Sequence, residues 1–166
     1  PIQNHASANL NNFRQNVQGD GLFSAPDLVV IAIQALCAEE GLLLEIVLGN
    51  QGDRGVLPGT KVAVYTELNG TEQFVTVLES TQLLPPGARE TLTYAWTTAQ
   101  ISRGDGKTFA VRAHADMDEE GNHQHNECIE DNNSLRIESS CPCRNDDDCI
   151  QGFWCNDEKA CRPVPQ

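Results

Sequence analysis

Residues 27–36 read DLVVIAIQAL and residues 42–48 read LLLEIVL, two short apolar runs rich in aliphatic side chains. The turn residues Asn50-Gln51-Gly52-Asp53 end the second run. Apolar runs of this length, bounded by Gly, Asn and Asp, are typical of β-strands. The start of the chain's apolar part therefore predicts two neighbouring strands.

Short apolar runs separated by turn residues continue along the chain, and Asn69-Gly70 is a strong hairpin signal among them. Five more runs are expected to be strands: 61–68, 72–78, 90–98, 108–115 and 134–138. No helical period separates them. The sequence predicts an all-β protein whose residues 27–138 form a seven-stranded, immunoglobulin-like antiparallel sandwich.

Two segments of different composition flank this region. Residues 1–26 are rich in Asn and Gln and predict an extended arm, with its apolar anchors at Leu10, Phe13, Val17, Leu22 and Phe23. We expect the arm to contact its own domain or a partner protein, neighbouring subunit or domain, which would allow a homo-oligomer or filament. Residues 139–166 form a Cys-rich tail. Pro1 is expected to follow a removed leader or a cut in a longer chain.

The charge balance excludes several classes of partner. Asp and Glu number 24 against 11 Lys and Arg, for a formal charge of -13 and a pI near 4.5. Nucleic acids and anionic lipid surfaces need positive counter-charge. No apolar run approaches the roughly 20 residues of a membrane-spanning helix. We expect no nucleic-acid partner and no membrane insertion.

Cysteine usage predicts the compartment. Five of the seven cysteines lie in the last 26 residues, spaced C-x-C-x5-C-x5-C-x5-C. The uniform later gaps favour disulfides over zinc, which prefers close pairs. Disulfides indicate an oxidising compartment, so we expect a secreted or cell-surface protein. Cys143, Cys149, Cys155 and Cys161 form an even set, Cys37 is expected to pair with Cys128, and Cys141 is left as the free or uncertain thiol.

Several polar motifs resemble the CARDB family of bacterial adhesion-related domains over roughly residues 26–138. They are Pro26-Asp27-Leu28-Val29-Val30, Gly49-Asn50-Gln51-Gly52, Leu57-Pro58-Gly59, Leu84-Pro85-Pro86-Gly87, Ala115-Asp116 and 126–133, Asn-Glu-Cys-Ile-Glu-Asp-Asn-Asn. This resemblance implies an immunoglobulin-like, non-catalytic module of a large secreted or surface protein. The tail resembles small units of the form C-x-x-D-x-D-C-x-x-G-x-x-C, from which Cys141 departs.

Residues 116–131 hold seven carboxylates and no Lys or Arg. Calcium prefers such oxygen ligands, so Asp116, Asp118, Glu127 and Glu130 are the candidate calcium ligands. EF-hand spacing is absent. The alternative is a solvated acidic hairpin.

Two further patterns are candidate sites. His123-x-His125, with His114 on the preceding strand, would allow a three-His zinc or copper site and hence a metalloenzyme. Arg103-Gly104-Asp105 is an RGD tripeptide at an expected turn, where the alternative is ordinary Gly-Asp-Gly turn chemistry.

Together these patterns predict a non-catalytic extracellular structural or adhesion module that docks or self-associates through its arm and tail. The alternative is a calcium-assisted carbohydrate- or ligand-binding module, and a metalloenzyme on the three histidines is the third.

Overall fold

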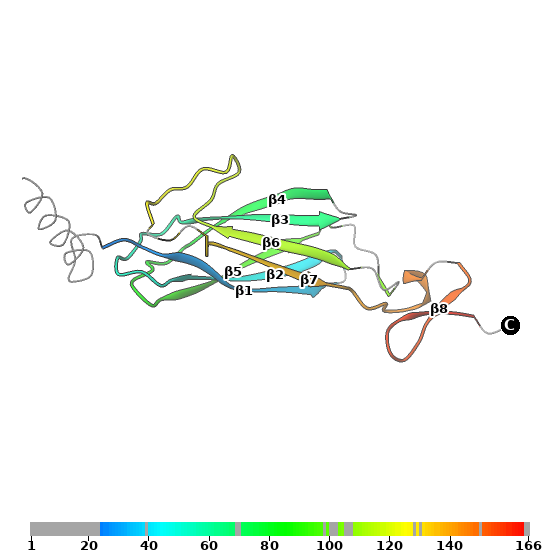
Figure 1. The fold of residues 1–166 in the computed structure, drawn as a ribbon. Helices are drawn as coiled ribbons and strands as arrows, with labels where there is room; N and C mark the ends of the chain where they lie inside the picture. The colour runs from blue at the N-terminus through cyan, green and yellow to red at the C-terminus, as the bar shows by residue number, and fades with distance from the viewer. Residues whose placement is uncertain are drawn as a thin grey trace, which may run out of the picture.

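The computed structural model describes residues 24–164, apart from 39, 69–70, 98, 100–102, 105–107, 128, 130 and 150. The expected arm anchors all lie within residues 1–23, outside this part of the chain. Figure 1 shows the described residues as a sandwich with a small unit at one end.

The protein is all-β with antiparallel sheets, as predicted. One sheet has the order β1-β2-β5, with strands Leu28–Cys37, Leu42–Asn50 and Arg89–Trp96. The other has the order β4-β3-β6-β7, with strands Thr71–Glu79, Lys61–Leu68, Phe109–Ala115 and Ser134–Ser139. The alternating apolar runs predicted all seven of these strands to within two residues at each end.

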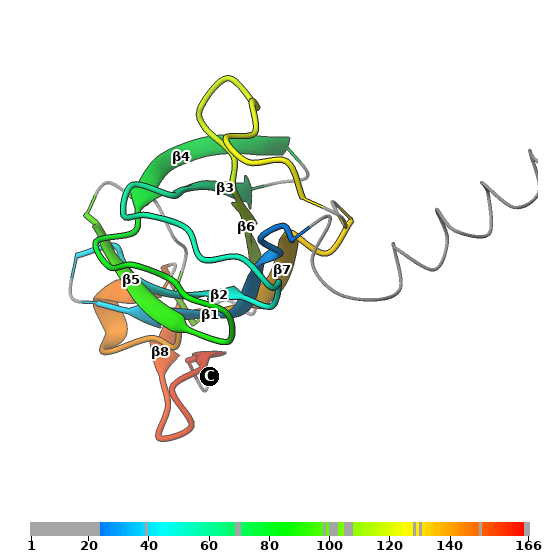
Figure 2. The same ribbon diagram turned by 90° about the vertical axis from the view of Figure 1, so that its left-hand side faces the viewer.

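A single apolar core lies between the two sheets. Every second residue of β2 faces it, and Leu42, Leu44, Ile46 and Leu48 are each no more than 1% exposed. Val62 and Val64 of β3 and Val111 of β6 meet them from the other sheet. In Figure 2, β3 and β4 lie on one side of the molecule and β1 and β2 on the other. Strand alternation thus buries one face of each sheet.

The sandwich has two ends, or poles, with different roles. The chain enters at the N-terminal pole, formed by residues 25–28, 50–54 and 80–88, and β1 runs from there to the opposite end (Figure 1). The C-terminal pole is formed by residues 37–38, 40–42, 103–104 and 141. The tail continues from it with a short 3-10 helix, Asp146–Asp148, and the hairpin β8 (Phe153–Cys155) and β9 (Cys161–Pro163).

The tail hairpin was not predicted, because its strands have three residues each and no apolar alternation. Within the described ranges, the structure contains no helix long and apolar enough to cross a membrane.

Candidate functional site

Asn50 joins three segments at the N-terminal pole. Its side chain is buried, and its Oδ1 accepts hydrogen bonds from the backbone N–H of Asp27 (3.2 Å) and Gly52 (3.0 Å). Its Nδ2 donates to the carbonyls of Arg54 (2.7 Å) and Leu84 (2.9 Å). An amide offers two donors and two acceptor sites, and here all four are used. Asn50 therefore fixes the entering chain, the turn after β2 and the loop before β5 together.

Gly52 allows the turn after β2 to lie directly on the entering chain. A Cβ at Gly52 would stand 2.4 Å from the Ala25 carbonyl oxygen and 2.5 Å from Asp27 N. Backbone hydrogen bonds join the same segments: Gln51 N–H to Asp27 O (2.7 Å) and Asp53 N–H to Ala25 O (3.1 Å). No side chain fits between them, so the Gly-Asn-Gln-Gly sequence acts as a clip on the entering chain.

The second polar motif closes on the same segment from the other sheet. Glu127 Oε2 accepts a hydrogen bond from Leu28 N–H at 2.8 Å. Asn132 Nδ2 donates to Asp27 Oδ1 at 2.8 Å, and the buried Asn133 accepts a hydrogen bond from Ala115 N–H through its backbone carbonyl. Two of the motifs that carried the family resemblance, Gly49-Asn50-Gln51-Gly52 and the described residues of 126–133, thus meet around residues 25–28.

The acidic hairpin is built around its own carboxylates. Asp116 is fully buried and accepts hydrogen bonds from the backbone N–H of Gln124 (3.1 Å) and His125 (2.8 Å), while His125 Nδ1 lies 2.5 Å from its Oδ1. Asp118 Oδ1 accepts the N–H groups of Glu120 and Asn122. The hydrogen bond from Asn122 N–H is the main cause that lowers the pKa of Asp118.

The structure does not gather the predicted metal ligands into one cluster. Among the described residues, no three side chains drawn from Asp116, Asp118, Glu127 and the histidines place their ligand atoms within 4.8 Å of one another. Glu130 lies outside the described residues. Calcium at these residues stays a prediction.

The three histidines each have contacts of their own, and the charge of His123 is also one of the causes that lower the pKa of His114. His114 packs edge-on against Tyr65 with ring centroids 5.8 Å apart, and burial, followed by the charge of Arg112, lowers its pKa. His123 lies opposite Met117 in an isolated β-bridge. His125 is held at Asp116. A zinc or copper site on these three histidines stays a prediction.

At the C-terminal pole, the structure corrects the predicted pairing of Cys37. Cys37 bonds to Cys141, so the expected Cys37–Cys128 bond and the free thiol at Cys141 are both wrong. Glu127, the residue before Cys128, binds Leu28 at the far end of β1 from Cys37. Nine strand steps of about 3.3 Å separate these two ends of β1 by about 30 Å, so Glu127 and Cys37 lie at opposite poles of the sandwich.

Cys128 itself lies outside the described residues. The six other cysteines pair among themselves, which leaves it no cysteine partner within these 166 residues.

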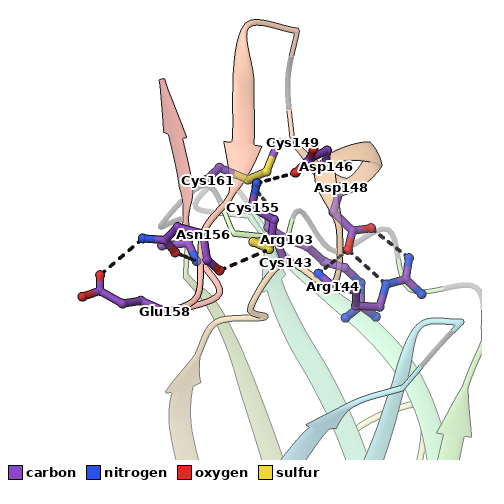
Figure 3. Close-up of a disulfide and its surroundings, with 11 residues drawn as sticks. Arg103, Cys143, Arg144, Asp146, Asp148, Cys149, Cys155, Asn156, Glu158 and Cys161 are labelled. Carbon is purple, nitrogen blue, oxygen red and sulfur yellow. Dashed lines mark hydrogen bonds and ion pairs between the residues drawn. A yellow bond between two sulfur atoms is a disulfide. The ribbon is translucent and has the colours of Figure 1, made fainter. Parts of the chain in front are cut away.

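Two overlapping disulfides hold the tail (Figure 3). Cys143 bonds to Cys155 and Cys149 to Cys161, each across 12 positions. The sulfurs of Cys143, Cys149 and Cys161 lie within 4.8 Å of one another. Each is part of a disulfide and is therefore no thiolate ligand for zinc.

The Asp146–Asp148 turn is tied to the rest of the tail by side-chain bonds. Asp148 accepts hydrogen bonds from Arg144 Nε (3.0 Å) and NH2 (2.8 Å), and Asp146 Oδ1 accepts Cys155 N–H. The hydrogen bonds from the Arg144 side chain are the main cause that lowers the pKa of Asp148 to about 2.

Arg103 and Gly104, two residues of the RGD tripeptide, join the sandwich to the tail. The Arg103 guanidinium donates to the carbonyls of Ala38 and Gly41 in the β1–β2 turn. Gly104 N–H donates to Cys141 O, and Gly104 O accepts Cys161 N–H, both at 2.7 Å. Gly104 has φ +67°, and a Cβ there would stand 2.5 Å from the Cys143 Cβ.

Asp105 lies outside the described residues. Integrin-type recognition at the tripeptide stays a prediction, and it would have to draw Arg103 away from the carbonyls that it binds.

A shallow hollow of about 570 Å³ lies at this junction, lined by Cys37, Ala38, Arg103, Pro142, Arg144 and Asn145.

Sequence reasoning missed the roles of Asn50, Arg103 and Gly104. The available signal for Asn50 was the Gly49-Asn50-Gln51-Gly52 sequence at the end of a buried strand.

Comparison with solved structures finds similar domains, among them a CARDB domain that was solved twice. A crystal structure of the CARDB domain of the PF1109 protein from Pyrococcus furiosus, described as in complex with di-metal ions, is 28% identical. The match covers 73% of this chain and 97% of that one, with a TM-score of 0.52. A solution structure of the same domain is 30% identical over 72% of this chain and 97% of that one, with a TM-score of 0.49.

No protein-family model matches the chain. No curated protein matches it either.

We predict that Asn50→Asp destabilises the fold. A carboxylate cannot donate to Arg54 O and Leu84 O, and the substitution leaves two buried carbonyls facing a charge. Urea unfolding at pH 7 should show a loss of about 2–4 kcal/mol in the free energy of unfolding. The same change at exposed Asn145, whose side chain forms no cap hydrogen bond, should leave that free energy within about 0.5 kcal/mol. Equal effects would contradict the role of Asn50.

We predict that the Arg144–Asp148 pair stabilises the protein above pH 4. The folded pKa of about 2 lies below the ordinary value of 3.8, so this stability is complete above pH 4 and is lost as the pH falls through about 2. Asp148→Asn should therefore lower the melting temperature at pH 6, with the difference from wild type shrinking between pH 4 and pH 2. Asp147→Asn is the control, and a constant difference at Asp148 would refute the linkage.

Proposed function

The chain carries a domain of the CARDB family, and from this premise we propose that the protein is a non-catalytic, extracellular structural or adhesion module. One observation carries the proposal. The chain enters and leaves the sandwich at opposite poles, and each pole fastens the segment that passes through it. A domain built in this way holds its two flanking segments apart at a set distance.

The proposed sandwich is immunoglobulin-like, with three strands facing four. Three disulfides favour an oxidising compartment and support an extracellular location. The polar side chains of the N-terminal pole bind backbone groups of the entering chain and of the adjacent turn. These contacts suit a structural role rather than catalysis. Docking or self-association through residues 1–26 stays a prediction.

The proposal predicts a fixed distance between sandwich and tail. Spectroscopic labels on non-natural side chains at exposed Thr91 and Asp157 leave the cysteines untouched. Double electron–electron resonance should give one narrow distribution of the distance between the two labels. Gly104→Ala should broaden it, because the added Cβ meets Cys143 and Cys161 at 2.5 and 2.8 Å.

Gly152→Ala is the matched control. Gly152 also has a positive φ, but no atom lies within 4 Å of its added Cβ. A broad distribution in the unchanged protein would contradict the structural role. Export is tested separately by labelling intact cells of the source organism with an antibody to the tail. Antigen found only after lysis would contradict it.

A cation-assisted binding module is the second candidate. The CARDB domain of PF1109 is described with di-metal ions. Here the Asn132 Oδ1 is buried and has no hydrogen-bond donor among the described residues, while the same amide binds Asp27. Carboxylate and amide oxygens are the ligands that calcium prefers, so Asp27 and Asn132 would begin such a site.

If this candidate is right, purified protein should contain about one calcium per chain. EDTA should lower the melting temperature by several degrees, because a bound ion stabilises the folded state. Asp27→Asn should abolish that shift, and Asp53→Asn should not. Metal-free protein with no response to added calcium would remove the candidate and leave the structural role standing.

A further inference from the structure

We propose that the protein is a load-bearing link in which tension passes along β1 and across the Cys37–Cys141 disulfide, so that the rest of the sandwich carries none of it. The inference gives the proposed structural role a mechanical use. It rests on the proposed function, but its experiment measures only which residues lie on the covalent path. Its failure can therefore be distinguished from failure of the structural role.

The covalent path through the chain is short. Cys37 and Cys141 lie 104 positions apart, so their bond takes residues 38–140 out of any line of tension along the chain. In the tail, Cys143–Cys155 and Cys149–Cys161 each bypass 12 positions. Tension applied at Ser24 and Val164 therefore crosses only about 24 peptide units, which span at most roughly 85 Å.

β1 is already extended between the two fastened poles. Its ten residues, Leu28–Cys37, run from the hydrogen bonds of Asn50 and Glu127 at the N-terminal pole to the disulfide at the C-terminal pole. A strand rises about 3.3 Å per residue, close to the limit of an extended chain. Pulling on its ends gains almost no length. The strand acts as a taut tether, and its pairing with β2 stays intact under load.

Non-covalent contacts brace the disulfide on both sides. Arg103 binds the β1–β2 turn next to Cys37, and Gly104 binds Cys141 and Cys161 on the tail. These contacts keep the tail from pivoting about the sulfur–sulfur bond. They also explain why an arginine and a glycine stand at this place in a strongly acidic chain.

Single-molecule stretching of the oxidised full chain, held by handles at its two ends, tests the proposal. We expect no extension step from the sandwich in the unchanged protein. Cys37→Ser/Cys141→Ser should add a step of about 360 Å, because 104 further peptide units enter the path. Adding reductant to the unchanged protein during stretching gives a second route to the same release and does not require the variant to fold.

Cys149→Ser/Cys161→Ser is the matched control. It removes one disulfide, yet the route through Cys143–Cys155 has the same number of units, so the path should lengthen by about 0 Å. A sandwich step of about 360 Å in the oxidised, unchanged protein would overturn the proposal. So would about 45 Å of extra contour, because that length belongs to a Cys37–Cys128 bond.

Discussion

The disulfide between Cys37 and Cys141 joins the end of the first strand to the second residue after the last strand of the sandwich. Closing a ring of about 100 residues removes conformational freedom from the unfolded chain worth about 4.7 kcal/mol in the chain-entropy model. The tail has few buried apolar residues of its own, so its position depends on this bond and on the Arg103–Gly104 contacts beside it.

Asn50 has the corresponding place at the opposite pole. It satisfies backbone groups from the entering chain and two loops with one buried amide. A buried polar group is stabilising only when all of its partners are present, and this one has all four. The two poles are thus secured by different means, hydrogen bonds at one and a covalent bond at the other.

Strands and their order along the chain could be predicted, because alternation along β2, β3, β5 and β6 reflects burial of one sheet face. Pairing of Cys37 could not be obtained from spacing. It depends on strand direction: β1 and β7 both end at the C-terminal pole, which places Cys37 beside Cys141 and far from Glu127. Seven strands were predicted, and if successive strands alternate in direction, the first and the seventh end at the same pole. That argument would have placed Cys37 near Cys141.

The candidate site was harder to predict than the fold. Acidic residues 116–131 suggested ligands, but Asp116 and Asp118 are taken up by N–H groups of their own hairpin. The RGD tripeptide suggested recognition, which stays a prediction, and two of its residues join the sandwich to the tail. In both cases a side chain serves a backbone group far along the chain or across a turn, and local sequence does not show such partners.

Disulfide mapping is the most direct test of this account. Non-reducing proteolysis of the purified, thiol-blocked protein, followed by mass spectrometry, identifies which peptides are cross-linked. We predict one linked pair that contains Cys37 and Cys141, with the blocking group on Cys128. A linked pair that contains Cys37 and Cys128, with the blocking group on Cys141, would contradict the fastening at the C-terminal pole and the load path that depends on it.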